Sequence, residues 1–484
     1  MEVSPARLGL LNRRRGGDAL EHTRMGKEVN SGMSAQAGSV EKKDFISRFS
    51  EWSLRWIPDS MVFVLVLSVV VYFMALGLTK SGPIEIVDHW VKGFWVLLTF
   101  AMQMCVLMIT GFAVADSPQV KALLKKLALM PKTPGQAIFY FALFDGFLWW
   151  VHWGVGYMVG IMLGRELVVA QRGKKLHYVA VAAACYAGIV IANGPSMAAQ
   201  LLVATPGHFI EKVVGVIPLS KTTFEPILLI MNLVLLISIP TIFYLLLPKK
   251  AVEADESIIQ EFTESAKPPV EKSLLTPAQR WDRSPVFMWI VGLAGLFWVG
   301  KFFYTKGIAN LDLNTLNFTF LVIGALLHGT PAAFMEAVKR ATTTVFGVII
   351  QFPFYAGIFG MISYSGLAKI FADWFVAIST PETFPFVVFV YSGFLNFFVP
   401  SGGSKFVIEA PYILPAAQQL GANVNYVINA YTTGDLTTNL LQPFWALPVL
   451  GAFRITFRDI LPYGFVICLW TILVASITYL MFMH

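Results

Sequence analysis

Two eleven-residue stretches decide the fold of this chain: GFLWWVHWGVG at residues 146–156 and GFLNFFVPSGG at residues 393–403. Each lies inside an apolar stretch of about 30 residues, 135–164 and 384–415, and each interrupts that stretch with glycine or proline. About 20 apolar residues cross a bilayer as a helix, so these stretches are too long for one upright span and too short for two. The pattern predicts two re-entrant hairpins, each entering and leaving the membrane on the same side.

The same stretches mark an internal repeat. Sliding the chain against itself by 247–248 residues places Gly146-Phe147-Leu148 on Gly393-Phe394-Leu395, and the match runs over about 105 residues. A further apolar span at 286–304 makes the number of crossings before the second copy odd. The second copy is therefore predicted to run upside down relative to the first. Inverted repeats with interrupted helices are typical of secondary transporters, which bind substrate near the middle of the membrane.

The composition indicates a membrane protein. Of the 484 residues, 56% are hydrophobic and 13% are charged, against roughly 25% charged residues in soluble domains. This excludes a soluble enzyme, a disordered scaffold and a secreted disulfide-rich module. We predict an all-α polytopic membrane protein with two inverted-topology repeats, each containing a re-entrant hairpin and a discontinuous helix. Besides the hairpins, full crossings are predicted at 57–79, 93–115, 178–206, 224–247, 286–304, 311–328, 341–362, 426–452 and 460–482.

The positions of lysine and arginine predict the orientation. With the amino terminus in the cytoplasm, the inside connections hold 18 basic residues and the outside connections hold 7. The bias requires the stretch 135–164 to return to its own side. Because these charges lie in connections between apolar spans, they indicate orientation and not a nucleic-acid partner. The predicted parts are a disordered cytoplasmic tail at 1–44, a first transmembrane repeat at 45–247, a cytoplasmic linker at 248–284 and a second transmembrane repeat at 285–484.

Four interruptions of the apolar stretches are candidates for binding small ions. Two are the hairpin tips, and two lie in the crossings that follow them. Broken helices expose backbone N–H and C=O groups, and helix amino termini attract anions; alternatively, glycine and proline only kink packed helices. The predicted substrate-binding residues are His152, Gly154, Gly156, Asn193, Gly194, Ser196, Ser401, Gly402, Gly403, Ser404 and Lys405.

An acidic residue at membrane depth predicts the coupling site, because such residues are costly and mark function. Asp435 is predicted to lie in a helix break at 434–439, together with Thr437, Thr438 and Asn439. Oxygen ligands suit Na+, whereas a lone acid suits H+, so both ions are candidates. Simpler alternatives exist: a structural ion pair for Asp435, a buried core histidine for His152 and a snorkelling side chain for Lys405. Asp145 and Glu409 are further ionisable candidates at depth.

The sequence carries no catalytic signature. It contains neither GxxxxGK[ST] nor HExxH, and Cys105, Cys185 and Cys468 lie in separate apolar spans without a CxxC pair. We therefore predict that the protein is not an enzyme, holds no cofactor and binds no metal beyond Na+ at Asp435.

A set of short motifs extends along most of the chain. The motifs are Arg55-Trp56-Ile57-Pro58-Asp59, Gly93-Phe94-Trp95, Met102-Gln103-Met104, Trp153-Gly154-Val155-Gly156, Ala204-Thr205-Pro206-Gly207, Gln351-Phe352-Pro353-Phe354-Tyr355-Ala356-Gly357, Val399-Pro400-Ser401-Gly402-Gly403 and Gln442-Pro443-Phe444-Trp445-Ala446-Leu447-Pro448. Over about residues 48–480 the chain resembles the bacterial short-chain fatty acid transporter family. The last three motifs are long enough to be specific. The family is similar to a wider ion-transporter superfamily with two inverted repeats, re-entrant hairpins and elevator motion, often as dimers.

The resemblance implies a function and a site. It implies cation-coupled uptake of short-chain fatty acids or related small monocarboxylates, such as acetoacetate and butyrate, across the bacterial inner membrane. The implied partners are a small organic anion, the lipid bilayer and a second copy in a homodimer. A dicarboxylate or other organic-anion carrier of the same superfamily is the alternative. The superfamily's site falls on Gly154, Gly156, 193–196, 401–403 and 435–439.

Overall fold

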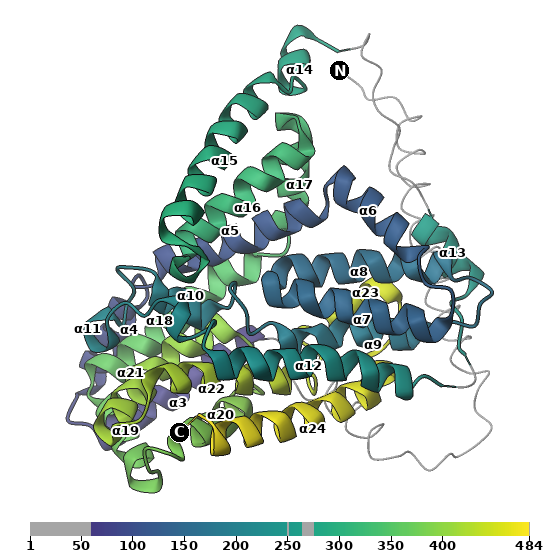
Figure 1. The fold of residues 1–484 in the computed structure, drawn as a ribbon. Helices are drawn as coiled ribbons and strands as arrows, with labels where there is room; N and C mark the ends of the chain where they lie inside the picture. Colours follow the sequence, from purple (N-terminus) through teal and green to yellow (C-terminus); the bar gives the residue numbers. More distant parts are fainter. Residues whose placement is uncertain (1–59, 249–250, 264–274, 484) are drawn as a thin grey trace, which may run out of the picture. The chain divides into compact units, whose positions relative to one another are not determined.

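The computed structural model describes residues 60–248, 251–263 and 275–483, and these residues form helices and loops without a β-strand (Figure 1). All of them belong to the compact unit Ser50–His484. The predicted tail at 1–44 lies outside the described residues.

The first half contains long helices, which follow the predicted spans closely, and shorter helices between them. They are α3 (Ser60–Leu78), α4 (Pro83–Gly93), α5 (Leu98–Ala115), α6 (Pro118–Ala128), α7 (Pro134–Val151), α8 (Trp153–Ala170), α9 (Tyr178–Ala187), the 3-10 turn η1 (Gly188–Ile191), α10 (Ala198–Ala204), α11 (Glu211–Val214) and α12 (Pro226–Leu245). The described parts of the linker add α13 (Glu256–Thr263) and α14 (Pro277–Asp282).

The second half repeats this order of elements. From α4 to α12 and from α17 to α24, a short helix is followed by a long apolar helix, a second short helix, two helices joined by a tip, an interrupted helix and a final long helix. Its helices are α15 (Val286–Lys306), α16 (Leu313–His328), α17 (Pro331–Thr342), α18 (Phe346–Tyr364), α19 (Leu367–Ile378), α20 (Phe384–Leu395), α21 (Gly402–Leu420), α22 (Val424–Asn439), α23 (Leu447–Phe453) and α24 (Phe457–Met481).

A hydroxyl residue followed by proline begins several helices. The Oγ1 atom of Thr133 accepts a hydrogen bond from the backbone N–H of Gln136 at 3.2 Å, and Pro134 occupies the first helical position of α7. Ser117 starts α6 and Thr330 starts α17 in the same way. The side-chain oxygen satisfies a free N–H group, and proline loses nothing at a position that has no intrahelical partner.

Four short helices, α4, α6, α17 and α19, were not predicted. Each carries apolar residues on one side only; in α17, Ala337 and Ala341 are buried while Glu336 and Lys339 face outward. A helix of this kind lies at an interface and does not cross it. Hydropathy averaged over the length of a membrane span does not detect such short, one-sided segments. They were therefore predicted to be connections between spans.

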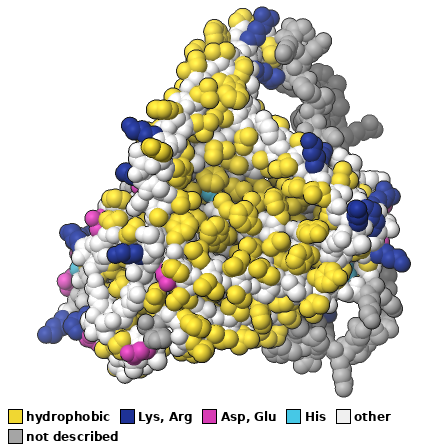
Figure 2. All heavy atoms as spheres, viewed as in Figure 1, with side chains coloured by type: hydrophobic (Ala, Val, Ile, Leu, Met, Phe, Trp, Pro, Cys, Tyr) yellow, Lys and Arg dark blue, Asp and Glu magenta, His cyan; other side chains and the backbone are white. Residues whose placement is uncertain are grey.

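The structure confirms an all-α, multi-pass membrane protein. Seven helices in the described residues are long and apolar enough to cross a membrane. They account for six of the predicted crossings and for α8, one arm of the first predicted hairpin. The crossing predicted at 311–328 is the shorter helix α16, and those at 178–206 and 426–452 are interrupted. Figure 2 shows a broad hydrophobic face with the lysine and arginine side chains mostly near its margins.

The helices pack as two groups. We call α3, α4, α5 and α15–α18 the scaffold group, and α7–α9, α12 and α20–α24 the core group, because contacts within each set are extensive. The helix after each tip makes the main contact between the groups: α8 packs against α5, and α21 packs against α18. The short helices α6 and α19, which belong to neither group, also pack on α8 and α21. Equivalent helices of the two halves therefore form the boundary between the groups.

Contacts join the two ends of the first predicted hairpin, and α19 packs on both arms of the second. The side-chain Nε2 of Gln171, just after α8, donates to the carbonyl oxygen of Pro131, just before α7, at 2.9 Å. In the second pair, Phe375 of α19 packs on Phe384 at the start of α20 and on Tyr412 of α21, with ring centroids 6.0 and 6.1 Å apart. These contacts fit the prediction that each segment returns to the side from which it began, and the labelling experiment below tests it.

The described part of the linker contacts α8 of the core group and the loop that follows it. The carboxylate of Glu253 accepts hydrogen bonds from the backbone N–H groups of Gly173 and Lys175, at 3.2 and 3.0 Å. The guanidinium of Arg165 on α8 lies 4.2 Å from the ring centroid of Phe262 on α13. The loop after α8 and the segment 251–263 therefore lie on the same side of the molecule.

This arrangement predicts a labelling pattern in intact cells. Lys174→Cys and Gln260→Cys should react with a membrane-impermeant thiol reagent only after the cells are opened, because both exposed positions are predicted to face the cytoplasm. The native cysteines are buried, so the background should be low.

Ser220→Cys is the matched control, because Ser220 is exposed in a connection predicted to lie outside. It should react in intact cells. Reaction of Lys174→Cys in intact cells would mean that the segment 135–164 crosses the membrane once, and the inverted repeat would be lost.

Candidate functional site

The two tips share one backbone geometry although their residues differ. His152 has φ −156° and ψ 105°, and Ser401 has φ −151° and ψ 105°. The Nδ1 atom of His152 accepts from the N–H of Val155 at 3.3 Å, and the Oγ atom of Ser401 accepts from the N–H of Ser404 at 3.4 Å. Each residue therefore caps the helix that follows it, α8 or α21.

Each tip is also tied to the break in the interrupted helix of its own half. The backbone N–H of Trp153 donates to the Oγ atom of Ser196 at 2.8 Å. In the second half the indole Nε1 of Trp445 donates to the carbonyl oxygen of Pro400 at 2.9 Å. The two halves thus make the same connection with different chemical groups.

The first break lies where it was predicted. Helical structure stops at Ile191 and resumes at Ala198, on either side of the predicted residues 193–196. A Cβ atom on Gly194 would lie 1.8 Å from the carbonyl oxygen of Trp150, so only glycine allows the break to approach the first tip. The side chain of Asn193 is engaged: it donates to the Oγ1 atom of Thr433 and accepts from Gln200.

The second break was predicted wrongly at 434–439. Helix α22 continues to Asn439, and the break is at 440–446. The hydroxyls predicted to share a cation donate instead to backbone carbonyls, Thr437 to Thr433 at 2.6 Å and Thr438 to Gly393 at 2.9 Å. Pro443, which cannot donate to the helix ladder, lies in the actual break.

The groups freed by the second break find partners across the two halves. The hydroxyl of Tyr186 on α9 donates to the carbonyl oxygen of Asn439 at 2.7 Å. The side chain of Asn439 accepts from Asn396 and Gln442, at 2.8 and 2.9 Å. A break at membrane depth is tolerated because neighbouring side chains satisfy its polar groups.

Lys405 and Asp435 form a buried ion pair. The Nζ atom of Lys405 lies 2.9 Å from Oδ1 of Asp435 and donates to the carbonyl oxygen and the Oγ atom of Ser392, each at 2.8 Å. It also lies 4.8 Å from the ring centroid of Tyr431. The Lys405 side chain is fully buried, so the ammonium is neutralised within the core group and does not snorkel to the surface.

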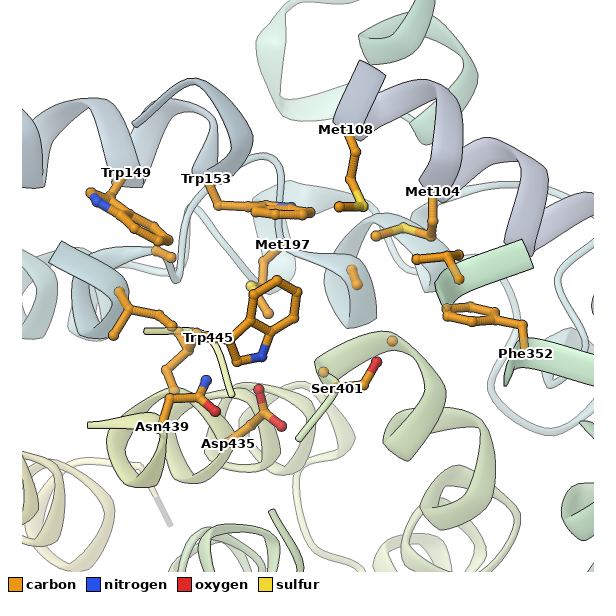
Figure 3. A pocket seen from close by; sticks show the side chains of 17 residues that line it. Met104, Met108, Trp149, Trp153, Met197, Phe352, Ser401, Asp435, Asn439 and Trp445 are labelled. Atoms are coloured by element: carbon orange, nitrogen blue, oxygen red, sulfur yellow. The ribbon is translucent and has the colours of Figure 1, made fainter. Parts of the chain in front are cut away.

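A cavity lies where the tips and breaks face the scaffold group. Its inner part holds about 80 Å³ and is lined mainly by apolar side chains, among them Met104, Met108 and Phe352. Figure 3 shows the Asp435 carboxyl group and Ser401 on one side, with Trp153 and the two methionines opposite them. A wider part of about 660 Å³ shares Trp153, Ser401 and Trp445 with the inner part.

The predicted substrate residues divide into two sets. Ser401, Gly402 and Gly403 line the inner cavity, and Gly154 and Ser404 line the wider one. The others lie outside both linings as described, and they cap, pack or pair within the protein: His152, Gly156, Asn193, Gly194, Ser196 and Lys405. The ring of His152 packs on Phe320, with centroids 4.1 Å apart, and thus behaves as a buried core histidine.

Sequence reasoning missed the apolar half of the cavity. Trp149 and Trp445, with Met104, Met108 and Phe352, belong to the inner lining. Several of these residues lie in the motifs that carried the family resemblance, which was the available signal. Of the predicted coupling residues, Asp435 and Asn439 line the cavity. In the residues that the structure describes, no group of three His, Cys, Asp or Glu side chains is placed to hold a metal.

Comparisons with known proteins agree with this picture of the chain. The family model described as "Short chain fatty acid transporter" matches residues 43–483. A protein of Escherichia coli (strain K12) is 36% identical over 422 residues, covering 86% of this chain and 95% of its own length. A protein of Haemophilus influenzae (strain ATCC 51907 / DSM 11121 / KW20 / Rd) is 35% identical over 432 residues, with the same coverage. Both bear the name "Putative short-chain fatty acid transporter".

Among solved structures, the chain is similar to the YdaH transporter of Alcanivorax borkumensis, whose structure is described as having an unusual topology. The two share 14% identity with a TM-score of 0.47, over 87% of this chain and 98% of the other.

Proposed function

Because the chain belongs to the short chain fatty acid transporter family, and is therefore a transporter and not an enzyme, we propose that it takes up small monocarboxylates by cation-coupled secondary transport. The substrates are short-chain fatty acids and related anions of the acetoacetate and butyrate class. The protein acts in the bacterial inner membrane with its amino terminus in the cytoplasm, and it works as a homodimer.

One observation carries the proposal: the inner cavity between the second tip and the scaffold group. This cavity holds about 80 Å³ and continues into the wider part of about 660 Å³, so the proposal rests on the chemistry of the lining and not on size. An apolar wall with a few polar groups at one side suits a short alkyl chain with one carboxylate. Gly402 and Gly403 start α21 there, so the positive end of that helix faces the cavity.

The alternative, a dicarboxylate carrier, fits this site less well. A second carboxylate needs a second set of polar donors, and Lys405, the one lysine or arginine buried among the described residues, is already paired with Asp435. The lining opposite Asp435 consists of methionine and aromatic side chains. A small monocarboxylate is therefore the better match.

An elevator motion of the core group along the scaffold group would give alternating access. The repeated order of elements, with the odd number of predicted crossings between the halves, supports two repeats of inverted topology. The wider cavity reaches Thr343, just after α17, and Leu447, at the start of α23. These ends lead to connections predicted to lie inside, so we assign this conformation to the inward-open state.

Uptake by proteoliposomes tests the function. With Na+ and H+ gradients imposed separately, radiolabelled butyrate and acetoacetate should accumulate under at least one gradient, and succinate should not compete. Accumulation of succinate in preference to butyrate would favour the dicarboxylate alternative. Absence of accumulation of any of these anions under either gradient would contradict the proposal.

Asp435→Asn should separate coupling from binding. Asparagine keeps the shape of the side chain and removes the charge that a coupling cation would neutralise. We expect gradient-driven accumulation to fall by about tenfold, within the 5–150-fold range typical of coupling between sites, while exchange of labelled for unlabelled substrate continues.

Asp88→Asn is the matched control, because Asp88 is an exposed residue of α4, far along the chain from both tips. It should leave accumulation and exchange unchanged. If accumulation by Asp435→Asn equals that of the unmodified protein under both gradients, Asp435 has a structural role only.

A further inference from the structure

A second acid lies behind the ion pair and has no role in the function proposed so far. Glu409 is fully buried on α21, one turn after Lys405, and its Oε1 atom lies 4.0 Å from the Nζ atom of Lys405. Neither carboxyl oxygen of Glu409 has a hydrogen-bond partner. Asp435, in contrast, lies 2.9 Å from the same nitrogen.

The ammonium of Lys405 lies closer to Ser392 and Asp435 than to Glu409. It donates hydrogen bonds to the carbonyl and hydroxyl oxygens of Ser392, each at 2.8 Å, and its nitrogen lies 2.9 Å from Oδ1 of Asp435, against 4.0 Å from Oε1 of Glu409. Lys405 is therefore committed to Asp435 in this conformation, with Glu409 as a second, more distant acid.

The surroundings of Glu409 supply no other positive charge. Three tyrosines of the packed helices interact electrostatically with Glu409: Tyr391 of α20, Tyr412 of α21 and Tyr431 of α22. The acid and base groups that face Glu409 are Lys405 and Asp435. Among the described residues Lys405 is the only buried lysine or arginine.

Charge balance then decides the protonation of the cluster. Two ionised carboxylates and one ammonium would leave a net negative charge in an apolar interior, which is strongly unfavourable. One bound proton makes the cluster neutral. Asp435 holds the ammonium at the shorter distance and is the partner that benefits from ionisation, so the proton belongs on Glu409.

We propose that Glu409 and Asp435 form a proton-binding pair with Lys405 as their shared counter-charge. The pair holds one proton, on Glu409 in the present conformation and on Asp435 when a substrate carboxylate enters the cavity. Only Asp435 of the three lines the inner cavity, so an entering anion meets its carboxyl group first. A neutral Asp435 removes the repulsion between that group and the anion.

The transfer needs one relay through the amine. The O–H bond of Glu409 breaks as its proton bonds to the Lys405 nitrogen, while one N–H proton of Lys405 bonds to a carboxylate oxygen of Asp435. The ammonium stays charged and the number of protons is unchanged. Lys405 then pairs with ionised Glu409. The link to substrate rests on the proposed function, whereas the proton on Glu409 does not.

Infrared difference spectroscopy of the full-length protein in lipid tests the proton directly. At neutral pH without substrate, the carbonyl band of a buried, protonated carboxylic acid should be present and should disappear in Glu409→Gln. Glu336→Gln, at an exposed position on α17, is the matched control and should leave this band unchanged. Asp145→Asn identifies any band that comes from Asp145, whose two buried carboxyl oxygens also have no hydrogen-bond partner.

Substrate then tests the relay. Addition of butyrate should replace the Glu409 band by one that is absent in Asp435→Asn. Identical spectra of Glu409→Gln and the unmodified protein at neutral pH would show that Glu409 is ionised and overturn the proposal. A Glu409 band that butyrate does not change would overturn the relay. If the unmodified protein does not bind butyrate, the proposed function is contradicted, whereas the protonation of Glu409 is not affected by that result.

Discussion

Lys405→Ala should lower the free energy of unfolding by about 3–5 kcal/mol, the usual cost of removing one partner from a buried ion pair. The substitution leaves Asp435 without its counter-charge and breaks two hydrogen bonds to Ser392. It also removes the ammonium from the face of the Tyr431 ring, where it lies 4.8 Å from the centroid. The stability of the purified protein against titration with a denaturing detergent measures the change.

A matched control and a compensating variant isolate the charge. Lys301→Ala changes an exposed lysine on α15 and should alter stability by less than about 0.5 kcal/mol. Lys405→Met combined with Asp435→Asn removes both charges of the pair and should recover most of the lost stability, because the remaining acid, Glu409, carries the proton. A double variant as unstable as Lys405→Ala would show that lost packing, and not an unpaired charge, is the cause.

Gly402→Leu should reduce uptake to background while the protein still folds and inserts. A Cβ atom on Gly402 would lie 3.0 Å from Asp435 Oδ2 and 3.0 Å from the Cε atom of Met197. The rest of a leucine side chain would occupy the inner cavity of about 80 Å³, where the substrate carboxylate is proposed to bind. Uptake into proteoliposomes, with insertion checked by yield and size-exclusion profile, measures the effect.

Gly403→Leu should have a similar effect by a different route. A Cβ atom there meets Phe100 and Phe352 at an ordinary 3.5 Å, so only the outer atoms of leucine are in conflict with the cavity. Gly300→Leu is the control, because a Cβ atom on Gly300 of α15 has no neighbour within 4 Å. Normal uptake by both tip variants would reduce the tip to a packing turn.

The sequence predicted the helical segments well because the signals are local. Apolar length alone identified α3, α5, α12 and α24 to within a few residues, since a span must match the thickness of the bilayer. Glycine and proline identified both tips, and the structure adds that His152 and Ser401 cap the helices that follow. The short helices α4, α6, α17 and α19 were not predicted, because hydropathy averaged over the length of a span hides their one-sided pattern.

The position of the second helix break could not be predicted from the local sequence alone. Gly434 suggested a break, yet α22 continues through it. A Cβ atom at this position would lie 2.2 Å from the carbonyl oxygen of Phe389, so the close approach of α20 requires glycine. The glycine serves close packing of α22 on α20. Pro443 ends the helical run instead, and the two kinds of residue cannot be told apart until the neighbouring helix is known.

The sequence by itself determined the class of the protein, most of its long helices, the two tips and the family to which it belongs. Each of these depends on residues close together in the chain, or on hydropathy, which is a one-dimensional property. Only the tertiary structure decided that Lys405 faces Asp435 and not the cavity, that Glu409 lies behind them, and that methionine and tryptophan side chains line the opposite wall. Those contacts depend on how α5, α21 and α22 are rotated about their axes when they pack, and hydropathy along the chain carries no record of that rotation.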